Sequence, residues 1–282
     1  MHGIGALMIV LPWLAAAPVS ATAPSQIESR LDNGLHVLVR SRPERTLVTL
    51  DVIYGAGAAA EPDSLAGLAH LTEHLLCKGE PRRRLELLAL ASNASTSTVT
   101  MTFTSTCLPS LLPQILDIEV ARMAGAAWDS VVFVREQSVV LEELAYRGGY
   151  RDTSPRDVAF RTAFPGHPFG RAPGGRPETV ARIRPGDVHD FVARAVHPGT
   201  ALLVIDGPVD PEQAVAAVRE RFGPLVTGPP RCELPPYPDV DARQSVFDNR
   251  DHKGYRISAV VRVPIADASE LALADLAIAY LG

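Results

Sequence analysis

Strands are predicted where apolar residues fall on alternate positions, because successive side chains of a strand point to opposite faces. Leu35, Val37 and Val39 show this period, and it resumes at 47–54, so we expect two strands joined by a turn at 41–44. A third strand is expected at 97–105, where apolar residues alternate with threonines. The continuous apolar run at 201–206 predicts a buried strand.

Helices are predicted where apolar residues recur three and four positions apart. The segments 111–124 and 132–147 have this spacing, and a helix at 65–78 follows Pro62-Asp63-Ser64, which supplies an N-cap candidate. That helix is expected to stop at Gly79. Shorter helices are expected at 83–91, 155–162, 185–195 and 211–222.

A proline-rich stretch at 228–238 predicts a domain boundary, since its composition favours a stiff, polyproline-like linker. We therefore expect one domain at 24–227, a linker at 228–243 and the beginning of a second domain at 244–282. This last part would hold a strand near 254–263 and a helix at 268–281.

Composition and net charge exclude some classes of protein for this chain. The chain has 282 residues, of which 46% are hydrophobic and 21% charged, so it can bury a large core and global disorder is excluded. The net charge is −5, and the longest basic run is Arg82-Arg83-Arg84, so no nucleic-acid partner is expected. A solvated helix start explains that run better than a phosphate-binding patch.

The first 27 residues contain no Asp, Glu, Lys or Arg, which fits a signal peptide with its apolar region at 4–17. Small residues of the A-x-A type follow, so cleavage is expected near Thr22 or Pro24, and we expect a periplasmic or secreted protein. The apolar region is too short for a stable membrane span. Only His2 and the α-amino group could be positive before it, which leaves an uncleaved anchor or a misassigned start as alternatives.

Three cysteines, Cys77, Cys107 and Cys232, are too few and too scattered for a disulfide framework, and none has the spacing of a metal site. One disulfide is permitted but not assigned, and buried inert thiols explain the pattern as well.

Candidate chemistry lies in the expected helix at 65–78, which contains His70-Leu71-Thr72-Glu73-His74. At about 100° per residue, His70, Glu73 and His74 project within an arc of about 100°. Two imidazoles on one helix face suit Zn²⁺, and a carboxylate beside them can take a proton from water. Histidines satisfied in a core or at a surface are the alternative for this motif alone.

A third ligand is expected from the helix at 132–147, which offers Glu136, Glu142 and Glu143. Glu136 and Glu143 are seven residues apart and share a face within about 20°, whereas Glu142 lies about 100° from Glu143. A solvated acidic face, paired with Arg135 or Arg147, is the alternative.

Several segments in order resemble the inverted-zincin metallopeptidases of the pitrilysin, insulinase and mitochondrial processing peptidase type. The likeness spans about 31–282 and rests on these segments: LDNGL at 31–35, GLAHLTEHLL at 67–76, KG at 78–79, NAST at 93–96, FVREQSVVLEE at 133–143, PGHP at 165–168, HP at 197–198 and ALLVI at 201–205. An ordered set of this kind is far more specific than the five-residue motif.

The resemblance implies an α+β, processing-peptidase-like domain in which a mixed sheet packs against helices. It implies one Zn²⁺ per chain held by His70, His74 and Glu143, with Glu73 as general base. Glu136 is implied as an electrostatic partner that orients the ligands. The resemblance also implies substrate-binding residues: Asn93 and Ala94 match the segment of the cleft along which the substrate adds as an extended strand. For Asn93, an ordinary turn asparagine is the alternative.

Length is the main departure from the family, whose members continue through a second homologous domain that closes the cleft. Here the second domain stops after its first strand and helix, so we expect a fragment or a truncated paralogue that finds its second half in a homologous chain. The expected function is zinc-dependent hydrolysis of peptides or unfolded segments. A weak or inactive partner subunit and a zinc hydrolase with a non-peptide substrate are the alternatives.

Overall fold

The computed structural model describes residues 25–125, 128–146 and 155–230. The expected leader at 1–23, the linker from residue 231 onward and the second domain at 244–282 lie outside the described residues. No helix in the described part of the chain combines the length and apolar character needed to cross a membrane.

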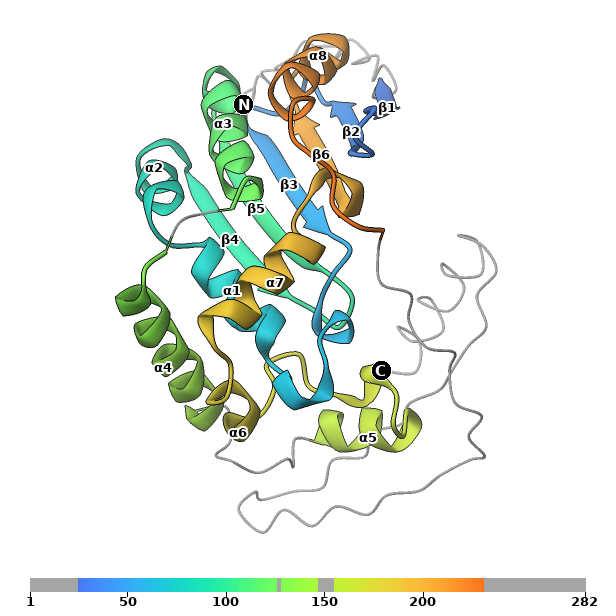
Figure 1. The fold of residues 1–282 in the computed structure, drawn as a ribbon. Coiled ribbons are helices and arrows are strands. Elements are labelled where there is room, and N and C mark those ends of the chain that lie inside the picture. The colour runs from blue at the N-terminus through green and yellow to red at the C-terminus, as the bar shows by residue number, and fades with distance from the viewer. Residues whose placement is uncertain (1–24, 126–127, 147–154, 231–282) are drawn as a thin grey trace, which may run out of the picture.

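A six-stranded mixed sheet forms the centre of the fold (Figure 1). Its strands are β1 (Gln26–Arg30), β2 (His36–Ser41), β3 (Val48–Tyr54), β4 (Ala91–Thr96), β5 (Met101–Cys107) and β6 (Ala201–Gly207). The spatial order is β1-β2-β6-β3-β5-β4. β2 and β6 run parallel, and the other neighbouring pairs are antiparallel.

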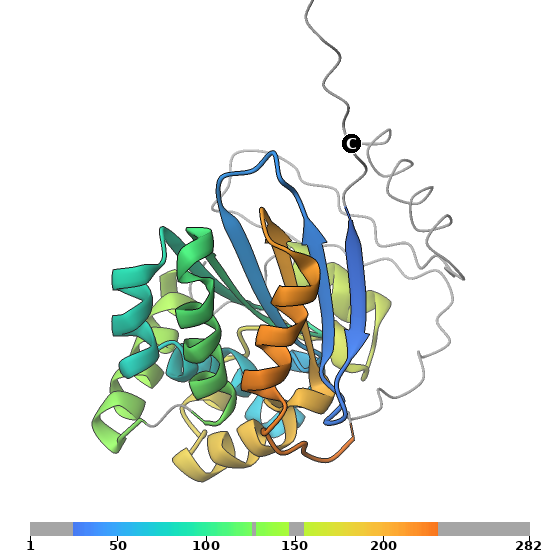
Figure 2. The same cartoon turned by 90° about the horizontal axis from the view of Figure 1, so that it is seen from above.

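Helices cover one face of this sheet, on which α1, α3, α7 and α8 lie (Figures 1 and 2). The helices are α1 (Leu68–Leu76), α2 (Glu80–Leu88), α3 (Leu112–Met123), α4 (Ser130–Tyr146), α5 (Pro155–Ala163), α6 (Pro177–Val180), α7 (Pro185–Ala195) and α8 (Pro211–Phe222). Short 3-10 turns occur at Ala58–Ala60, Asp63–Leu65, Pro109–Leu111, Pro168–Gly170 and Pro198–Thr200. The predicted α+β fold with a mixed sheet against helices is confirmed.

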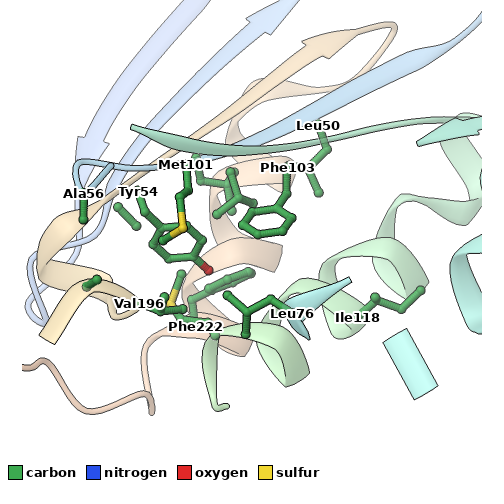
Figure 3. Packing of buried hydrophobic residues seen from close by; sticks show 14 of the residues in the cluster. Leu50, Tyr54, Ala56, Leu76, Met101, Phe103, Ile118, Val196 and Phe222 are labelled. Atoms are coloured by element: carbon green, nitrogen blue, oxygen red, sulfur yellow. The ribbon is translucent and has the colours of Figure 1, made fainter. Parts of the chain in front are cut away.

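The core forms between the sheet and these helices because alternate strand residues point toward them. β3 and β5 alternate buried and half-buried positions along their whole length. Figure 3 shows Tyr54, Met101 and Phe103 of the sheet facing Leu76 of α1 and Phe222 of α8. Helix α1, which carries the histidine motif, is thus packed against the sheet.

Two strands were not predicted. β1 was missed, and β4 occupies Ala91–Thr96, where the sequence predicted a helix end and a loop. The strand expected at 97–105 is wrong at its start, because residues 97–100 form the turn between β4 and β5. Small residues such as Ala, Ser and Asn have low strand propensity, and pairing with β5 makes this segment a strand.

Candidate metal centre

Helix α1 presents His70, Glu73 and His74 on one side, as the helical period requires. The rings of His70 and His74 lie edge to face with their centroids 4.8 Å apart. His70 and Glu73 are buried, at 9% and 8% exposure.

The N-terminal end of α1 is bound by the buried side chain of Glu61. Its two carboxylate oxygens accept hydrogen bonds from the backbone N–H groups of Gly67 and Ala69, each at 2.7 Å. Burial raises the pKa of Glu61 to about 7, although these N–H groups and Arg171 oppose the shift. Glu61 therefore caps the helix N-terminus, a role that the sequence predicted for Pro62-Asp63-Ser64.

The N-cap predicted within Pro62-Asp63-Ser64 is wrong, because α1 begins at Leu68, three residues later than expected. Ser64 lies in the exposed 3-10 turn Asp63–Leu65, and Gly67 with φ 100° is the residue before the helix. Only glycine adopts this left-handed backbone without strain. It also makes room for a neighbour, since a Cβ on Gly67 would lie 2.8 Å from the carbonyl oxygen of Gly174.

The C-terminal end of α1 is bound by Arg122 of α3. Its Nε donates a hydrogen bond to the carbonyl oxygen of Leu76 at 3.2 Å, and its guanidinium lies 4.4 Å from the ring centroid of Phe103. Glu119 pairs with Arg122, and both side chains are buried. The histidine helix is thus fixed at both ends by residues outside it.

Helix α4 brings a carboxylate to the two histidines. Glu143 Oε2 lies 3.7 Å from His70 Nε2, and its Oε1 lies 3.6 Å from His74 Nε2. One donor atom from each of the three residues falls within 4.8 Å of the others. Two imidazoles and one carboxylate are a donor set that catalytic zinc takes, and separations of this size fit a tetrahedral ion.

The other two glutamates of α4 have different surroundings. Glu142 is exposed, so the structure does not bring it to the histidines. Glu136 is buried, and its Oε2 lies 3.5 Å from His74 Nδ1 and 3.0 Å from Lys78 Nζ. The predicted alternative of a solvated acidic face is therefore wrong for Glu136. This carboxylate faces Nδ1 of His74, whereas Nε2 of the same ring faces Glu143.

Charge around Glu136 favours its ionised form. Burial raises its pKa, but Lys78, Arg135 and His74 outweigh burial and hold the pKa below its ordinary value. An ionised carboxylate at Nδ1 fixes the orientation of the His74 ring and leaves Nε2 for a metal. Lys78 belongs to the segment at 78–79 that carries the family resemblance, but the sequence predicted no role for its side chain.

Glu73 is held by the sheet. Thr96 Oγ1 donates a hydrogen bond to Glu73 Oε2 at 2.7 Å. No role was predicted for Thr96, because the strand expected in this region begins at residue 97. Had β4 been recognised, its period of two would have put Ala94 and Thr96 on one face and Asn93 on the other.

Asn93 and Ala94 lie in the middle of β4, so the alternative of a turn asparagine is wrong. Asn93 is exposed and Ala94 is half-buried. In the described part of the chain, β4 ends the sheet and pairs only with β5. The structure therefore brings Ala94 toward the helices and leaves Asn93 on the opposite face.

Two family models match the chain in order. The model of the insulinase peptidases, peptidase family M16, matches residues 36–145, and the model of the peptidase M16 inactive domain matches residues 182–282.

Curated relatives include an uncharacterised zinc protease of Mycobacterium bovis, 31% identical over 217 residues, with 74% of this chain and 49% of the relative covered. The probable β subunit of the mitochondrial-processing peptidase of Arabidopsis thaliana is 28% identical over 225 residues, with 77% and 42% covered. This chain therefore spans about half the length of these relatives.

Solved structures with the same fold include a protease from Helicobacter pylori, with a TM-score of 0.67 at 24% identity over 76% of this chain and 53% of that one. Pitrilysin has a TM-score of 0.65 at 25% identity over 77% of this chain and 25% of its own. The first half of a periplasmic protease from Escherichia coli has a TM-score of 0.66 at 21% identity, covering 76% and 48%.

Proposed function

This chain belongs to the M16 family of peptidases, and from that premise we propose that it is a zinc-dependent metalloendopeptidase that hydrolyses peptides or unfolded segments. One observation carries the proposal. His70, His74 and Glu143 converge to within 4.8 Å beside Glu73, which projects from the same helix as the two histidines.

The three converging residues would hold one zinc ion. When bound, zinc supplies Lewis-acid chemistry, which makes water a stronger acid and stabilises negative charge on oxygen. Glu136 would keep the ring of His74 oriented through Nδ1, and Lys78 would keep Glu136 ionised.

Glu73 would act as general base and then as general acid. Its carboxylate would take the proton of the attacking water and deliver it to the leaving amine as the peptide bond breaks. Its burial on the histidine face supports this role, because a carboxylate there is held near the reacting atoms.

The substrate would bind along β4 as an added strand, with Asn93 and Ala94 in contact with it. Among the described strands, β4 pairs on one side only, which supports this proposal, since an edge strand offers unpaired backbone groups to an extended peptide. Recognition through backbone groups suits unfolded segments, which can adopt the extended form.

A second homologous half would complete the cleft, either from a longer chain or from a partner chain. The coverage of about half of each curated relative supports this proposal.

We also propose that the protein is exported, because the segment at 1–23 has the uncharged composition of a leader. N-terminal sequencing of the protein recovered from outside the cytoplasm should give a start near Thr22 or Pro24, and a start at Met1 would contradict export.

An inactive partner subunit is the competing function. Such a subunit would need none of His70, Glu73, His74 and Glu143, and here all four are present. His70, His74 and Glu143 converge to within 4.8 Å, and Glu73 lies on the helix of the two histidines. This favours the enzyme.

The test is peptide hydrolysis by the purified chain, with chelator and with added Zn²⁺, alone and with a homologous second half. Glu73→Gln should lower kcat by about 10²–10⁴-fold while the zinc content stays at one per chain, because only the base is lost. Glu143→Gln should lower zinc affinity by more than the about 10–100-fold typical of residues that merely orient a ligand.

Glu142→Gln is the matched control, since Glu142 is exposed on the same helix as Glu143. It should leave both zinc affinity and kcat unchanged. Full activity in Glu73→Gln, or activity that survives removal of zinc, would overturn the proposed function.

A further inference from the structure

The hydroxyl of Thr96 contacts the proposed general base from the strand on which substrate would bind. Thr96 Oγ1 donates to Glu73 Oε2 at 2.7 Å, and Glu73 is 8% exposed. We propose that Thr96 is a positioning residue that fixes the carboxylate of Glu73 and links it to the substrate-binding edge of β4. This inference rests on the proposed function and assigns a residue that the resemblance left without a role.

Thr96 is itself held firmly. It pairs with Met101 at the end of the β4–β5 ladder, and the next residue, Ser97, donates its N–H to the Thr100 carbonyl oxygen at 2.8 Å. Hydrogen bonds on both sides hold the backbone of Thr96, so its Cβ keeps its position relative to Glu73 before a substrate binds.

The turn after Thr96 is also bound to the segment that leads into α1. Ala58 N–H donates to the Ser97 carbonyl oxygen at 3.1 Å, and Ala59 N–H donates to that of Thr98 at 2.7 Å. Gly57 allows this approach, because a Cβ there would lie 2.3 Å from the Ser97 oxygen. The end of β4 and the approach to α1 therefore form one unit.

The position of Thr96 within β4 sets which face it shares. Thr96 pairs with Met101 and Ala94 with Phe103, both core residues, so the two side chains point to the helix side of the sheet. Asn93 points to the opposite face. A peptide added to the free side of β4 would thus lie along the same strand whose last residue holds the base.

The hydrogen bond from Thr96 orients the carboxylate of Glu73. An O–H donor on a carboxylate makes a charge-assisted bond and limits rotation of the group. Loss of the hydroxyl would remove this orienting contact, which slows the chemical step without removing a substrate contact.

The experiment compares Thr96→Val, Thr96→Ser and Thr102→Val in the full chain under the conditions in which the wild type hydrolyses peptide. Thr96→Val keeps the β-branched shape and should lower kcat by about 10–100-fold with KM within about twofold, since removing an outer partner has effects of this size. Zinc content should not change. Thr96→Ser restores the hydroxyl and should recover most of kcat.

Thr102→Val is the matched control, because Thr102 lies on the neighbouring strand and its side chain points to the other face of the sheet. It should leave kcat unchanged. The proposal is overturned if Thr96→Val keeps the wild-type kcat, if Thr96→Ser is as slow as Thr96→Val, or if the loss appears in KM or in zinc content.

A wild-type chain that hydrolyses no peptide, even with a homologous second half, contradicts the proposed function rather than the role of Thr96. In that case, crystal structures of the wild type and of Thr96→Val test the positioning role of Thr96. We expect the Glu73 carboxylate to turn away from its wild-type position in the variant, and an unchanged carboxylate would overturn the positioning role.

Discussion

The two ends of helix α1 are held by buried side chains of opposite charge. Glu61 binds the first backbone N–H groups, and Arg122 binds the last carbonyl group. Each charge has the sign that the helix dipole favours at its end. The same nine-residue helix carries both proposed histidine ligands, so its placement decides the geometry of the site.

The two ends differ in how the charge is balanced. Arg122 is paired with Glu119 and stacked near Phe103, so the C-terminal anchor is a neutral pair. Glu61 faces backbone N–H groups, and burial raises its pKa to about 7. The comparison shows two ways to anchor a helix end: an ion pair of two buried side chains, or a buried carboxyl group that binds backbone N–H groups and whose protonation depends on pH.

The largest effect is expected at the C-terminal end. Arg122→Met leaves Glu119 buried without its partner and the Leu76 carbonyl oxygen without its donor, so the free energy of unfolding should fall by about 3–5 kcal/mol. Urea denaturation measures this loss.

Two further variants make the interpretation specific. The double variant Glu119→Leu with Arg122→Met removes both charges and should recover most of the loss. Arg82→Met removes an exposed ion pair on α2 and should change stability by less than about 0.5 kcal/mol. Equal losses in the single and double variants would contradict the paired anchor.

The N-terminal end should respond to pH. Glu61 keeps its proton in the folded state up to about pH 7, whereas the unfolded chain loses it near the ordinary value of 4.5. The stabilising contribution is therefore complete below about pH 4.5 and is lost as the pH rises to about 7, by about 3 kcal/mol in all.

The measurement is the free energy of unfolding from pH 4 to 8 in chelator, for the wild type and for Glu61→Gln. The difference between the two proteins isolates Glu61 from other carboxylates, such as Glu136, whose lowered pKa acts in the opposite direction. Parallel pH curves for the two proteins would show that Glu61 does not titrate in this range.

The smallest effect concerns the close packing at the N-terminal end. Gly67→Ala and Gly125→Ala both place a Cβ on a left-handed residue, with φ 100° and 97°. Only at Gly67 would the Cβ meet neighbours, at 2.6 Å from Val180 and 2.8 Å from Gly174, whereas nothing lies within 4 Å at Gly125. Gly67→Ala should therefore cost about 1–3 kcal/mol more, measured by thermal unfolding. Equal losses of stability in the two variants would mean that backbone strain alone, without the close contacts, accounts for the glycine at position 67.

The sequence predicted what depends on local periodicity. His70, Glu73 and His74 share a face because the helical period places them there, and the structure has them on α1. Glu143 was favoured over Glu142 by its face relative to Glu136 and by the family likeness, and α4 brings it to the histidines. Long, regular helices carry such information within a few turns.

Features that depend on tertiary pairing were not predicted. β4 has a weak strand signal of its own, and without it the contact between Thr96 and Glu73 has no place in a sequence argument. Glu61 and Arg122 act on α1 from outside the positions where caps are sought. Their burial, not their spacing, identifies them.

The parallel pairing of β2 with β6 has a consequence for how the domain folds. β6 lies between β2 and β3, and its partner residues Arg40 and Asp206 are 166 residues apart in the sequence. The centre of the sheet therefore cannot close until nearly the whole domain has been synthesised. Contacts of such long range slow folding, because much chain entropy is lost before they form. We expect the insertion of β6 to be a late step that joins two preformed parts of the sheet.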